Sequence, residues 1–255
     1  MIAAIIQARN GSTRLPGKTC MKIAGKTVLE HVFSRVKKAE TPNEVFVATT
    51  VNPEDLPLVR LCAEKGIRVF CGSADDVLDR FYQLAKLIKP DHVIRITADC
   101  PLMDPAVIDK TVKTHLKAKA DYTSNVAHPT FPDGLDVEIF TFKALERTWQ
   151  CANLASEREH VTTYIRNHPE LFTQAEYKNP EDLSKHRWTL DEHQDWDFIS
   201  AVYKELYDEN PVFGIAETLK LLAEKPELER LNSDITRNEG LLKSLRNDKQ
   251  VFHGP

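Results

Sequence analysis

The sequence of 255 residues has no long apolar run, and this absence excludes several classes of protein. No stretch approaches the roughly 20 apolar residues that cross a bilayer, so we expect no transmembrane helix. The first apolar run covers only about six residues and has no basic segment before it, so we expect no secretory signal. Lys and Arg total 34, and Asp and Glu total 38, giving a formal charge of −4. Mild acidity without a dense basic block argues against general nucleic-acid binding.

Cysteine is sparse, and its spacing suggests no pairing. The chain has five cysteines, an odd number, and no two of them form a CxxC pattern. Closely spaced Cys and His ligands, which a zinc site needs, are missing as well. We therefore expect free thiols, a reducing cytoplasmic location and no structural zinc.

The first 120 residues alternate between short apolar runs and amphipathic stretches. We expect strands at 1–7, 44–49, 68–71 and 92–97, and helices around 28–36, 53–66, 73–89 and 105–119. Asn52 before Pro53 is a typical helix start, and Ser73 is a candidate cap for the next helix. Four successive β-α units predict an α/β fold with a mostly parallel sheet and helices on both faces.

The pattern changes after Asp121. We expect strands at 135–140, 172–178 and 187–190, and helices at 142–151, 156–167, 195–207 and 216–225. The tail from Asn232 is polar, and we expect it to pack loosely. The interpretation is a single domain, 1–255, in which residues 122–185 form an insertion that closes over a substrate or pairs two subunits.

The strongest chemical signal is the segment 8–18, which follows the first strand. It contains three cations (Arg9, Arg14 and Lys18), two glycines and two hydroxyl side chains. Ligands of open α/β sheets bind beyond the carboxyl ends of the strands, and glycines and arginines suit phosphate oxygens. The segment matches neither the Walker A pattern nor GxGxxG. It therefore predicts a phosphate-binding loop of a third kind.

Two carboxylates follow expected strands at the same edge. Asp99 comes after the strand at 92–97, and Asp191 after the one at 187–190. Mg²⁺ commonly takes one or two carboxylates together with waters and substrate phosphates. With the cationic loop, the two aspartates suggest a metal that bridges a nucleotide, although a lone aspartate there can equally cap a turn. Asp195 and Asp197 open a helix, so we interpret them as charges complementing its dipole.

These motifs resemble those of cytidylyltransferases that activate acidic sugars, the sialic-acid and Kdo type, and are closer to the spore-coat polysaccharide branch. The resemblance is carried by 8–18, Gly72-Ser73, Val77-Leu78-x-Arg80, 95–101, 132–138, 158–162 and 187–191, within about 1–210. It implies a Rossmann-like (GT-A-like) nucleotidyltransferase fold, CTP, Mg²⁺ and a homodimer. The family often has a second acid two positions before its later metal ligand. Thr189 stands there in this chain, so one or two metal ions stay open.

The resemblance also implies roles for individual residues. The nucleotide would contact Ala8, Arg9, Gly11, Ser12, Arg14, Lys18, Ser73, Arg80, Thr97 and Ala98, and the metal would bind Asp99 and Asp191. Arg14, Lys18, Asp99 and Asp191 would be the catalytic residues. Candidates for the acceptor are Asp136, Glu138, Arg158, His160 and Arg187. An exposed polar strand face for the two acids, and a structural ion pair for Arg158 and His160, are open alternatives.

The function that follows is transfer of CMP from CTP to a small acidic sugar or sugar phosphate, with release of pyrophosphate, for glycan or surface polysaccharide synthesis. We expect no nucleic-acid or membrane partner. Whether a hydroxyl or a phosphate attacks, and which group is the general base, stay open. The alternatives are a sugar-1-phosphate nucleotidyltransferase with another NTP, a nucleotide-dependent glycosyltransferase, and a nucleotide-binding subunit without activity.

Overall fold

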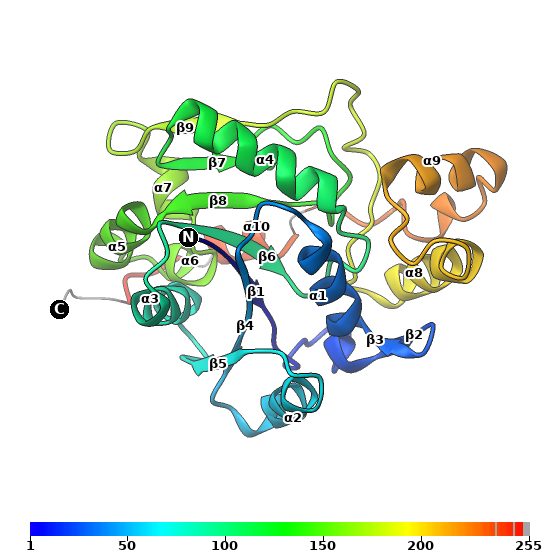
Figure 1. The fold of residues 1–255 in the computed structure, drawn as a ribbon, viewed down its shortest axis with the longest axis horizontal. Coiled ribbons are helices and arrows are strands. Elements are labelled where there is room, and N and C mark those ends of the chain that lie inside the picture. Colours follow the sequence, from blue (N-terminus) through cyan, green and yellow to red (C-terminus); the bar gives the residue numbers. More distant parts are fainter. Residues whose placement is uncertain (238, 247, 252–255) are drawn as a thin grey trace.

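A computed structural model describes residues 1–237, 239–246 and 248–251, and its core is one seven-stranded sheet (Figure 1). The strand order is β5-β4-β1-β6-β8-β7-β9. Strands β5, β4, β1 and β6 are parallel to one another, β8 is antiparallel to β6 and β7, and β9 is parallel to β7. This is the mostly parallel α/β sheet that the sequence predicts.

The sheet strands are β1 (Ile2–Gln7), β4 (Glu44–Thr50), β5 (Val69–Gly72), β6 (His92–Thr97), β7 (Tyr122–Ser124), β8 (Glu138–Thr141) and β9 (Gln174–Glu176), and a small hairpin joins β2 (Lys22–Ile23) to β3 (Lys26–Thr27). The α-helices are α1 (Val28–Lys38), α2 (Leu56–Glu64), α3 (Val77–Ile88), α4 (Pro105–Ala118), α5 (Phe142–Cys151), α6 (Ala155–Glu159), α7 (Thr163–Asn167), α8 (His193–Leu206), α9 (Ile215–Glu224) and α10 (Glu239–Arg246). Short 3₁₀ turns lie at Lys18–Cys20, Pro53–Asp55 and Glu229–Leu231.

Helices cover both faces of the sheet. Side chains of a strand point alternately to the two faces, so a strand that is apolar throughout needs cover on both. On β1, Ala4 and Ile6 are buried in the cluster that includes α1, α2, α4, α8 and α9. Ala3 and Ile5 are buried in the other cluster, with α3 and α5. A strand that is apolar at every position is therefore buried on both sides, as an interior parallel strand must be.

The N-terminal half follows the predicted elements, with one change at a helix start. Asn52 and Pro53 begin a 3₁₀ turn that leads into α2. The N-cap of α3 is Asp76, whose side chain accepts a hydrogen bond from the backbone N–H of Asp79, so the expected cap at Ser73 is wrong. Ser73 instead accepts a hydrogen bond from the N–H of Asp76 and shapes the turn before the helix.

The second half departs more from the sequence prediction. The expected helix at 156–167 is split into α6 and α7, because Val161 adopts a positive φ of 57° between them. Residues 187–190 form no strand and make a single bridge, from Arg187 to Asp133. The segment 122–185 supplies β7, β8 and β9, so it extends the main sheet.

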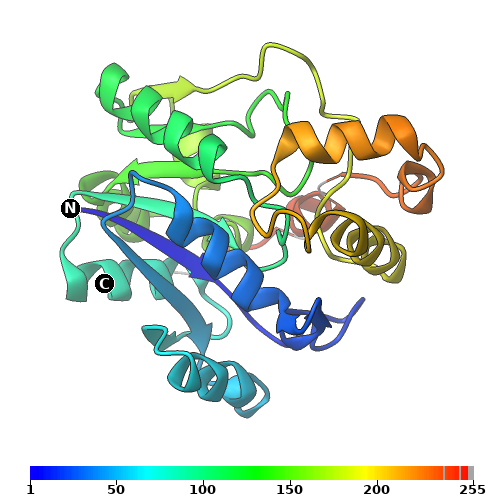
Figure 2. The same cartoon turned by 45° about the vertical axis from the view of Figure 1, so that its right-hand side comes forward.

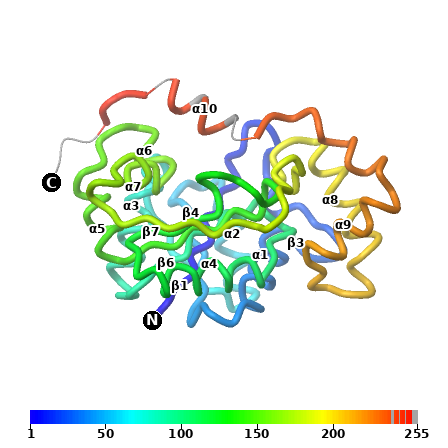
Figure 3. Tube along the Cα trace, turned by 90° about the horizontal axis from the view of Figure 1, so that it is seen from above, coloured from blue at the N-terminus to red at the C-terminus, as the bar shows by residue number. Residues whose placement is uncertain are grey.

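The C-terminal segment is joined to the rest of the domain by specific polar contacts, although most of its described residues are exposed, as the expected loose packing implies. In Figure 3, α10 lies across the top of the view, between the side of α8 and α9 and the side of α6. Asp248 accepts hydrogen bonds from the N–H and hydroxyl of Ser156, and Val251 donates to the carbonyl of Asn153. The part of the tail at 238, 247 and 252–255 lies outside the described residues.

Among the residues that the structure describes, none of the helices has the length and apolar character that a membrane span requires. The helices are seen from a second side in Figure 2, where α8 and α9 lie beside the edge of the sheet that carries the ends of β1 and β6.

Candidate active site

A cavity of about 780 Å³ lies where β1 and β6 end. Both strands run in the same direction, so the loop after Gln7 and the loop after Thr97 meet at one edge of the sheet, as an open α/β sheet requires of its ligand site. The predicted site residues that line this cavity are Ala8, Arg9, Gly11, Ser12, Arg14, Lys18, Arg80, Thr97, Ala98, Asp99, Asp136, Glu138, His160, Arg187 and Asp191. The fold thus brings together side chains that lie far apart in the sequence.

The ammonium group of Lys18 joins the two predicted metal ligands. Its Nζ lies 2.7 Å from Oδ2 of Asp99 and 2.6 Å from Oδ1 of Asp191, and it also donates to the carbonyl of Leu190 at 2.8 Å. Burial alone would lower the pKa of Lys18, but the two carboxylates outweigh it and raise that pKa. Burial likewise opposes ionisation of Asp99, yet Lys18 lowers the pKa of that carboxyl. Lys18 and Asp99 are therefore both charged at neutral pH.

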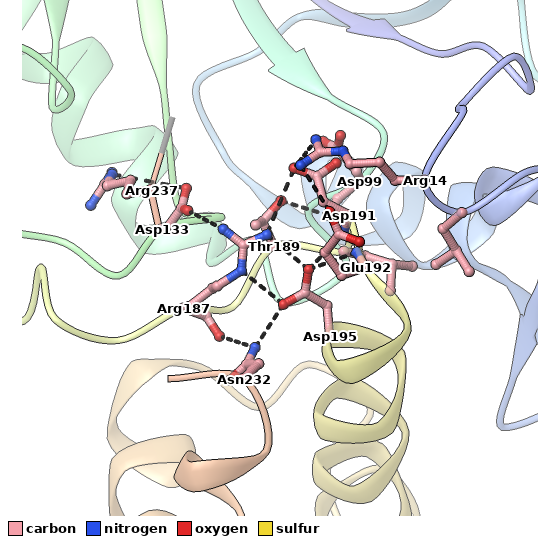
Figure 4. Close-up of polar contacts among 12 residues, drawn as sticks. Arg14, Asp99, Asp133, Arg187, Thr189, Asp191, Glu192, Asp195, Asn232 and Arg237 are labelled. Atoms are coloured by element: carbon pink, nitrogen blue, oxygen red, sulfur yellow. Dashed lines mark hydrogen bonds and ion pairs between the residues drawn. The ribbon is translucent and has the colours of Figure 1, made fainter. Parts of the chain in front are cut away.

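Arg14 adds a second cation to this cluster. Its guanidinium lies 3.1 Å from Oδ2 of Asp191 and 3.1 Å from Oε1 of Glu192 (Figure 4). The loop that carries it is held by local hydrogen bonds, from the N–H of Leu15 to the hydroxyl of Ser12 and from the N–H of Gly17 to the carbonyl of Asn10. These hydrogen bonds order the loop, which places the positive charge of Arg14 at the wall of the cavity.

Arg9 and Arg80 extend this positive wall. Burial and the nearby charge of Arg9 lower the pKa of Arg80, which shows two cations close together. Arg80 donates to the carbonyl groups of Ser73 and Ala74, which are neutral acceptors. Two neighbouring guanidinium groups beside a cavity suit a polyanion such as a triphosphate.

The donor set fits a magnesium ion. Among the described residues no cluster of three or more His, Cys, Asp and Glu side chains could hold a metal, so Asp99 and Asp191 stand as a pair. Mg²⁺ needs only one or two carboxylates when waters and substrate phosphates complete its shell. The two carboxylates both contact one cation, the ammonium of Lys18, so they lie close enough together to share a positive charge.

Behind Asp191 lies a buried ion-pair network (Figure 4). Arg187 donates through Nε and Nη2 to the two oxygens of Asp195 at 2.8 Å each, and through Nη1 to Asp133 at 3.1 Å. Asp195 also accepts the backbone N–H groups of Asp191 and Glu192 at the start of α8. Arg187 lines the cavity, but its guanidinium is bound to the protein's own carboxylates, so it orients Asp191 and is a poor candidate for an acceptor ligand.

The far end of the cavity contains the predicted acceptor residues. Strand β8 begins at Glu138, so Asp136 precedes it, and the expected strand from residue 135 is too long. Glu138 is buried, and its oxygens accept hydrogen bonds from Arg95, Tyr122 and Thr162. Burial raises the pKa of a carboxyl, but Arg95 and the other donors lower the pKa of Glu138 overall.

Two predicted site residues lie outside the cavity lining. Arg158 is buried, and its guanidinium donates to Asp76 and to the carbonyls of Trp149 and Ala152, so the structural ion pair is the better interpretation and its acceptor role is corrected. The second residue is Ser73, whose hydroxyl accepts a hydrogen bond from the N–H of Asp76 in the turn before α3. His160 does line the cavity, where burial lowers its pKa and its ring lies 3.0 Å from the hydroxyl of Ser244.

Several cavity residues were not found from the sequence. Asp133, Arg95 and Arg166 line it, as do Thr236 and Ser244 of the C-terminal segment. Asp133 lies inside the motif at 132–138 and Arg95 inside the one at 95–101, so their place in the site could have been inferred from the sequence. The tail gave no signal, because its residues reach the site only through folding over a long sequence separation.

The comparisons with known proteins agree with this geometry. A sequence profile described as cytidylyltransferase matches residues 3–223. The chain belongs to the cytidylyltransferase family. The spore coat polysaccharide biosynthesis protein SpsF of Bacillus subtilis is 34% identical over 238 residues, which is 89% of this chain and 95% of that protein. This cytidylyltransferase thus falls on the spore-coat side of the family, as its motifs predict.

Two further relatives bear on the fold and the family. A cytidylyltransferase structure from Leptospira borgpetersenii serovar Hardjo-bovis superposes with a TM-score of 0.85 at 31% identity, covering 92% of this chain and 98% of that one. A 3-deoxy-manno-octulosonate cytidylyltransferase of Geobacter metallireducens is 38% identical over 113 residues, which is 44% of this chain and 43% of that protein. The predicted nucleotidyltransferase fold is confirmed, and the protein is a CTP-dependent nucleotidyltransferase.

Proposed function

We propose that this cytidylyltransferase transfers CMP from CTP to a small acidic sugar or a similar sugar-phosphate acceptor and releases pyrophosphate. The observation that supports this most directly is the Lys18 ammonium between Asp99 and Asp191, beside a loop rich in Arg. Similarity to SpsF and to a 3-deoxy-manno-octulosonate cytidylyltransferase supports an acidic sugar and a role in surface polysaccharide synthesis.

In this proposal the phosphate loop supplies the charge stabilisation. Arg9, Arg14 and Arg80 hold the triphosphate and offset the charge that builds on the leaving pyrophosphate. Asp99 and Asp191 would hold Mg²⁺, which would supply neutralisation of phosphate charge, and the Lys18 ammonium would donate to a phosphate oxygen. Direct in-line transfer needs no nucleophilic side chain, so positioning and charge carry the reaction.

The acceptor occupies the other end of the cavity, between β8 and α7. Arg95 and Arg166 line this end; Arg95 is paired with Glu138, whereas the guanidinium of Arg166 donates to the neutral hydroxyl of Thr163 and is the cation that can contact an acid group of the acceptor. A carboxylate or phosphate on the acceptor complements this cation. We further propose that the segment 122–185, which includes Glu138 and Arg166, contributes to a homodimer, and that the enzyme works in the cytoplasm.

A screen of pyrophosphate release tests the proposal. The four NTPs are each combined with 3-deoxy-manno-octulosonate, N-acetylneuraminate and hexose 1-phosphates, with and without Mg²⁺. We expect release with CTP and an acidic sugar, dependent on Mg²⁺. Release with another NTP and a sugar 1-phosphate would support the sugar-1-phosphate alternative. CTP binding without release across all acceptors would support a non-catalytic subunit.

A further inference from the structure

The acidic side chains in the cavity differ in what they already bind. Asp99 and Asp191 share Lys18, and both oxygens of Glu138 accept hydrogen bonds. Asp133 accepts a hydrogen bond from Arg187 at Oδ2, and its Oδ1 faces the Nε of Arg237. Glu159, which also lines the cavity, accepts a hydrogen bond from the hydroxyl of Ser244. Asp136 accepts one, at Oδ1, and its Oδ2 has no hydrogen-bond partner in the part of the chain that the structure describes. Asp136 is 29% exposed in its side chain and lines the cavity, so this oxygen is open to a ligand.

The partner of Asp136 lies outside the residues that the family profile matches. Arg237 lies beyond residue 223, where the family match ends. Its Nη2 is 2.7 Å from Oδ1 of Asp136, its Nη1 donates to the carbonyl of Phe131 at 3.0 Å, and its Nε lies 3.9 Å from Asp133. Arg237 itself does not line the cavity, so it acts on a ligand only through the carboxylates that it holds.

The segment around Arg237 is fixed at both ends. On one side, the amide of Asn232 is buried and donates to Asp195 and to the carbonyl of Arg187. On the other, the hydroxyl of Ser244 donates to Glu159 and lies 3.0 Å from the ring of His160. Arg237 thus lies between two anchored points of the chain, and it holds Asp136 at one oxygen while the other oxygen has no described hydrogen-bond partner.

We propose that Asp136 is the general base of the transfer and that Arg237 is its positioning residue. This rests on the proposed function and takes a sugar hydroxyl as the attacking group. Oδ2 of Asp136 accepts the hydroxyl proton while the hydroxyl oxygen bonds to the α-phosphorus of CTP. The bond from that phosphorus to the bridging oxygen breaks, and pyrophosphate leaves with the electron pair. Charge and atoms balance without any other reactant.

The electrostatics around Asp136 suit this role. Burial, together with Asp133 and Glu138, raises the pKa of Asp136 to about 7, while Arg237 and Arg95 act to lower it. Cys100, whose thiol lies in the same electrostatic environment, is neutral, because burial and the carboxylates of Asp99, Asp136 and Asp133 raise its pKa. A base is most effective when its pKa lies near the working pH. Removal of Arg237 therefore raises the pKa of Asp136 and leaves less of the base ionised at neutral pH.

The test compares single-turnover rates across pH for wild type, Asp136→Asn, Arg237→Gln and Arg237→Lys, with CTP, Mg²⁺ and the acidic sugar, 3-deoxy-manno-octulosonate or N-acetylneuraminate, that wild type converts faster. Arg246→Gln is the matched control, since it removes the same charge from an exposed position of the same segment. For Asp136→Asn we expect a loss of about 10²- to 10⁴-fold in rate, with CTP binding retained. For Arg237→Gln we expect the acid limb of the profile to move up by roughly 1 to 3 pH units.

The outcomes separate the base, its positioning residue and the proposed function. Three results together support the proposal. The Arg237→Gln rate recovers at high pH, Arg237→Lys keeps the acid limb of the wild-type pH profile, and the pH profile of Arg246→Gln is the same as that of wild type. A rate for Asp136→Asn within threefold of the wild-type rate, or an effect on acceptor KM alone, overturns the role of Asp136 as the general base. Equal loss in Arg237→Gln at every pH overturns the positioning role. Wild type that is inert with both acids but releases pyrophosphate from CTP with a hexose 1-phosphate overturns the general base alone, and wild type that is inert with every acceptor of the screen overturns the proposed function.

Discussion

Lys18 is the residue on which the charge balance of the site depends. Replacing it with Ala leaves Asp99 and Asp191 facing each other without their shared cation and removes a donor to phosphate. We expect kcat/KM to fall by about 10²- to 10³-fold, as when one preorganised charge contact is lost from a transition state. The measurement is steady-state pyrophosphate release with CTP and the acceptor found in the screen.

The matched control for this change is Lys22→Ala, at an exposed lysine of the neighbouring β2. It removes the same charge from the same end of the molecule without touching the cavity, so its kcat/KM should stay at the wild-type value. Turnover of Lys18→Ala at the wild-type rate would show that the loop is not the phosphate site.

Gly134 allows two segments of the site to approach each other. Its φ is +103°, and a Cβ at this position would lie 2.6 Å from the backbone N of Thr189 and from the backbone carbon of Trp188. We expect Gly134→Ala to lower the free energy of unfolding by more than the roughly 1–3 kcal/mol that an unfavourable backbone conformation costs alone, because backbone atoms must also move. Urea unfolding monitored by circular dichroism measures this difference.

Gly66→Ala separates the two causes. Gly66 has a φ of +65°, but no atom lies within 4 Å of the place that a methyl group would occupy, so the variant carries conformational strain without a clash. Its loss in unfolding free energy should be the smaller of the two. If both variants lose the same amount, the close approach of Gly134 to residues 188 and 189 contributes nothing to stability.

Single residues were predictable where a motif fixed their place in the chain. Lys18, Asp99 and Asp191 follow strands or expected strands, and strand ends define the ligand edge of an α/β sheet, so their convergence followed from local sequence. Arg158 was misassigned because the sequence does not show that Asp76 lies beside it, 82 positions away. Arg237 was missed for the same reason, since its partner Asp136 is 101 positions away.

At the scale of elements, α4 contacts the sheet through the buried His115 and the half-buried His92. The ring of His115 lies 3.0 Å from that of His92 on β6 and 3.0 Å from the hydroxyl of Thr123 on β7. Burial, with His92 adding to it, lowers the pKa of His115 from 6.5 to about 4, and Asp121 opposes this weakly. The folded protein therefore holds His115 neutral over a pH range in which the unfolded chain is protonated.

This pair predicts how stability depends on pH. Between pH 6.5 and about 4 the unfolded state binds one more proton at His115 than the folded state, so stability falls as the pH falls. One proton corresponds to a slope of up to about 1.4 kcal/mol per pH unit. We expect His115→Gln to be less stable at pH 7 but to show a shallower decline, measured by urea unfolding at several pH values. His193→Gln, at an exposed position, should keep the wild-type slope, and an unchanged slope in His115→Gln would contradict this account.

The sequence predicts the elements of the first half well because each carries its own signals. Thr27 and Glu30 form a reciprocal cap at the start of α1, Pro105 opens α4, and β6 matches its expected bounds at 92–97. The region 187–190 was mistaken for a strand because its alternating pattern is also produced by a chain that packs Trp188 and Leu190 into the core. An extended segment that buries every second side chain but does not pair with a sheet has the same sequence pattern as a half-buried strand.

For the whole molecule, the long-range arrangement was the least predictable part. The tail from Asn232 is polar, and polar composition alone indicates weak packing. In the structure the tail supplies Thr236 and Ser244 to the cavity and is joined to α6 by hydrogen bonds through Asp248. Polar contacts between distant segments leave no periodic pattern in a sequence, so neither composition nor spacing could reveal them.

A ligand that binds only the folded state stabilises the whole chain by mass action, which gives a test of the nucleotide site as a unit. CTP with Mg²⁺ at about 100 times its dissociation constant should add about 2.7 kcal/mol, or a rise in Tm of roughly 5 to 10 °C for a protein of this size. Thermal unfolding is measured with each of the four NTPs, with Mg²⁺ or with EDTA. We expect the largest shift with CTP and Mg²⁺, because phosphate and metal contacts form together with contacts to the base.

The double variant Asp99→Asn, Asp191→Asn should lose the part of this shift that depends on Mg²⁺, because two neutral amides hold the ion more weakly than two carboxylates. Asp208→Asn, which removes an exposed carboxylate after α8, is the control and should keep the full shift. Equal shifts with all four NTPs would show that the base is not read and would favour the alternative of another nucleotide. A shift that persists unchanged in the double variant would place the metal elsewhere, since the pair that shares Lys18 would then have no part in holding it.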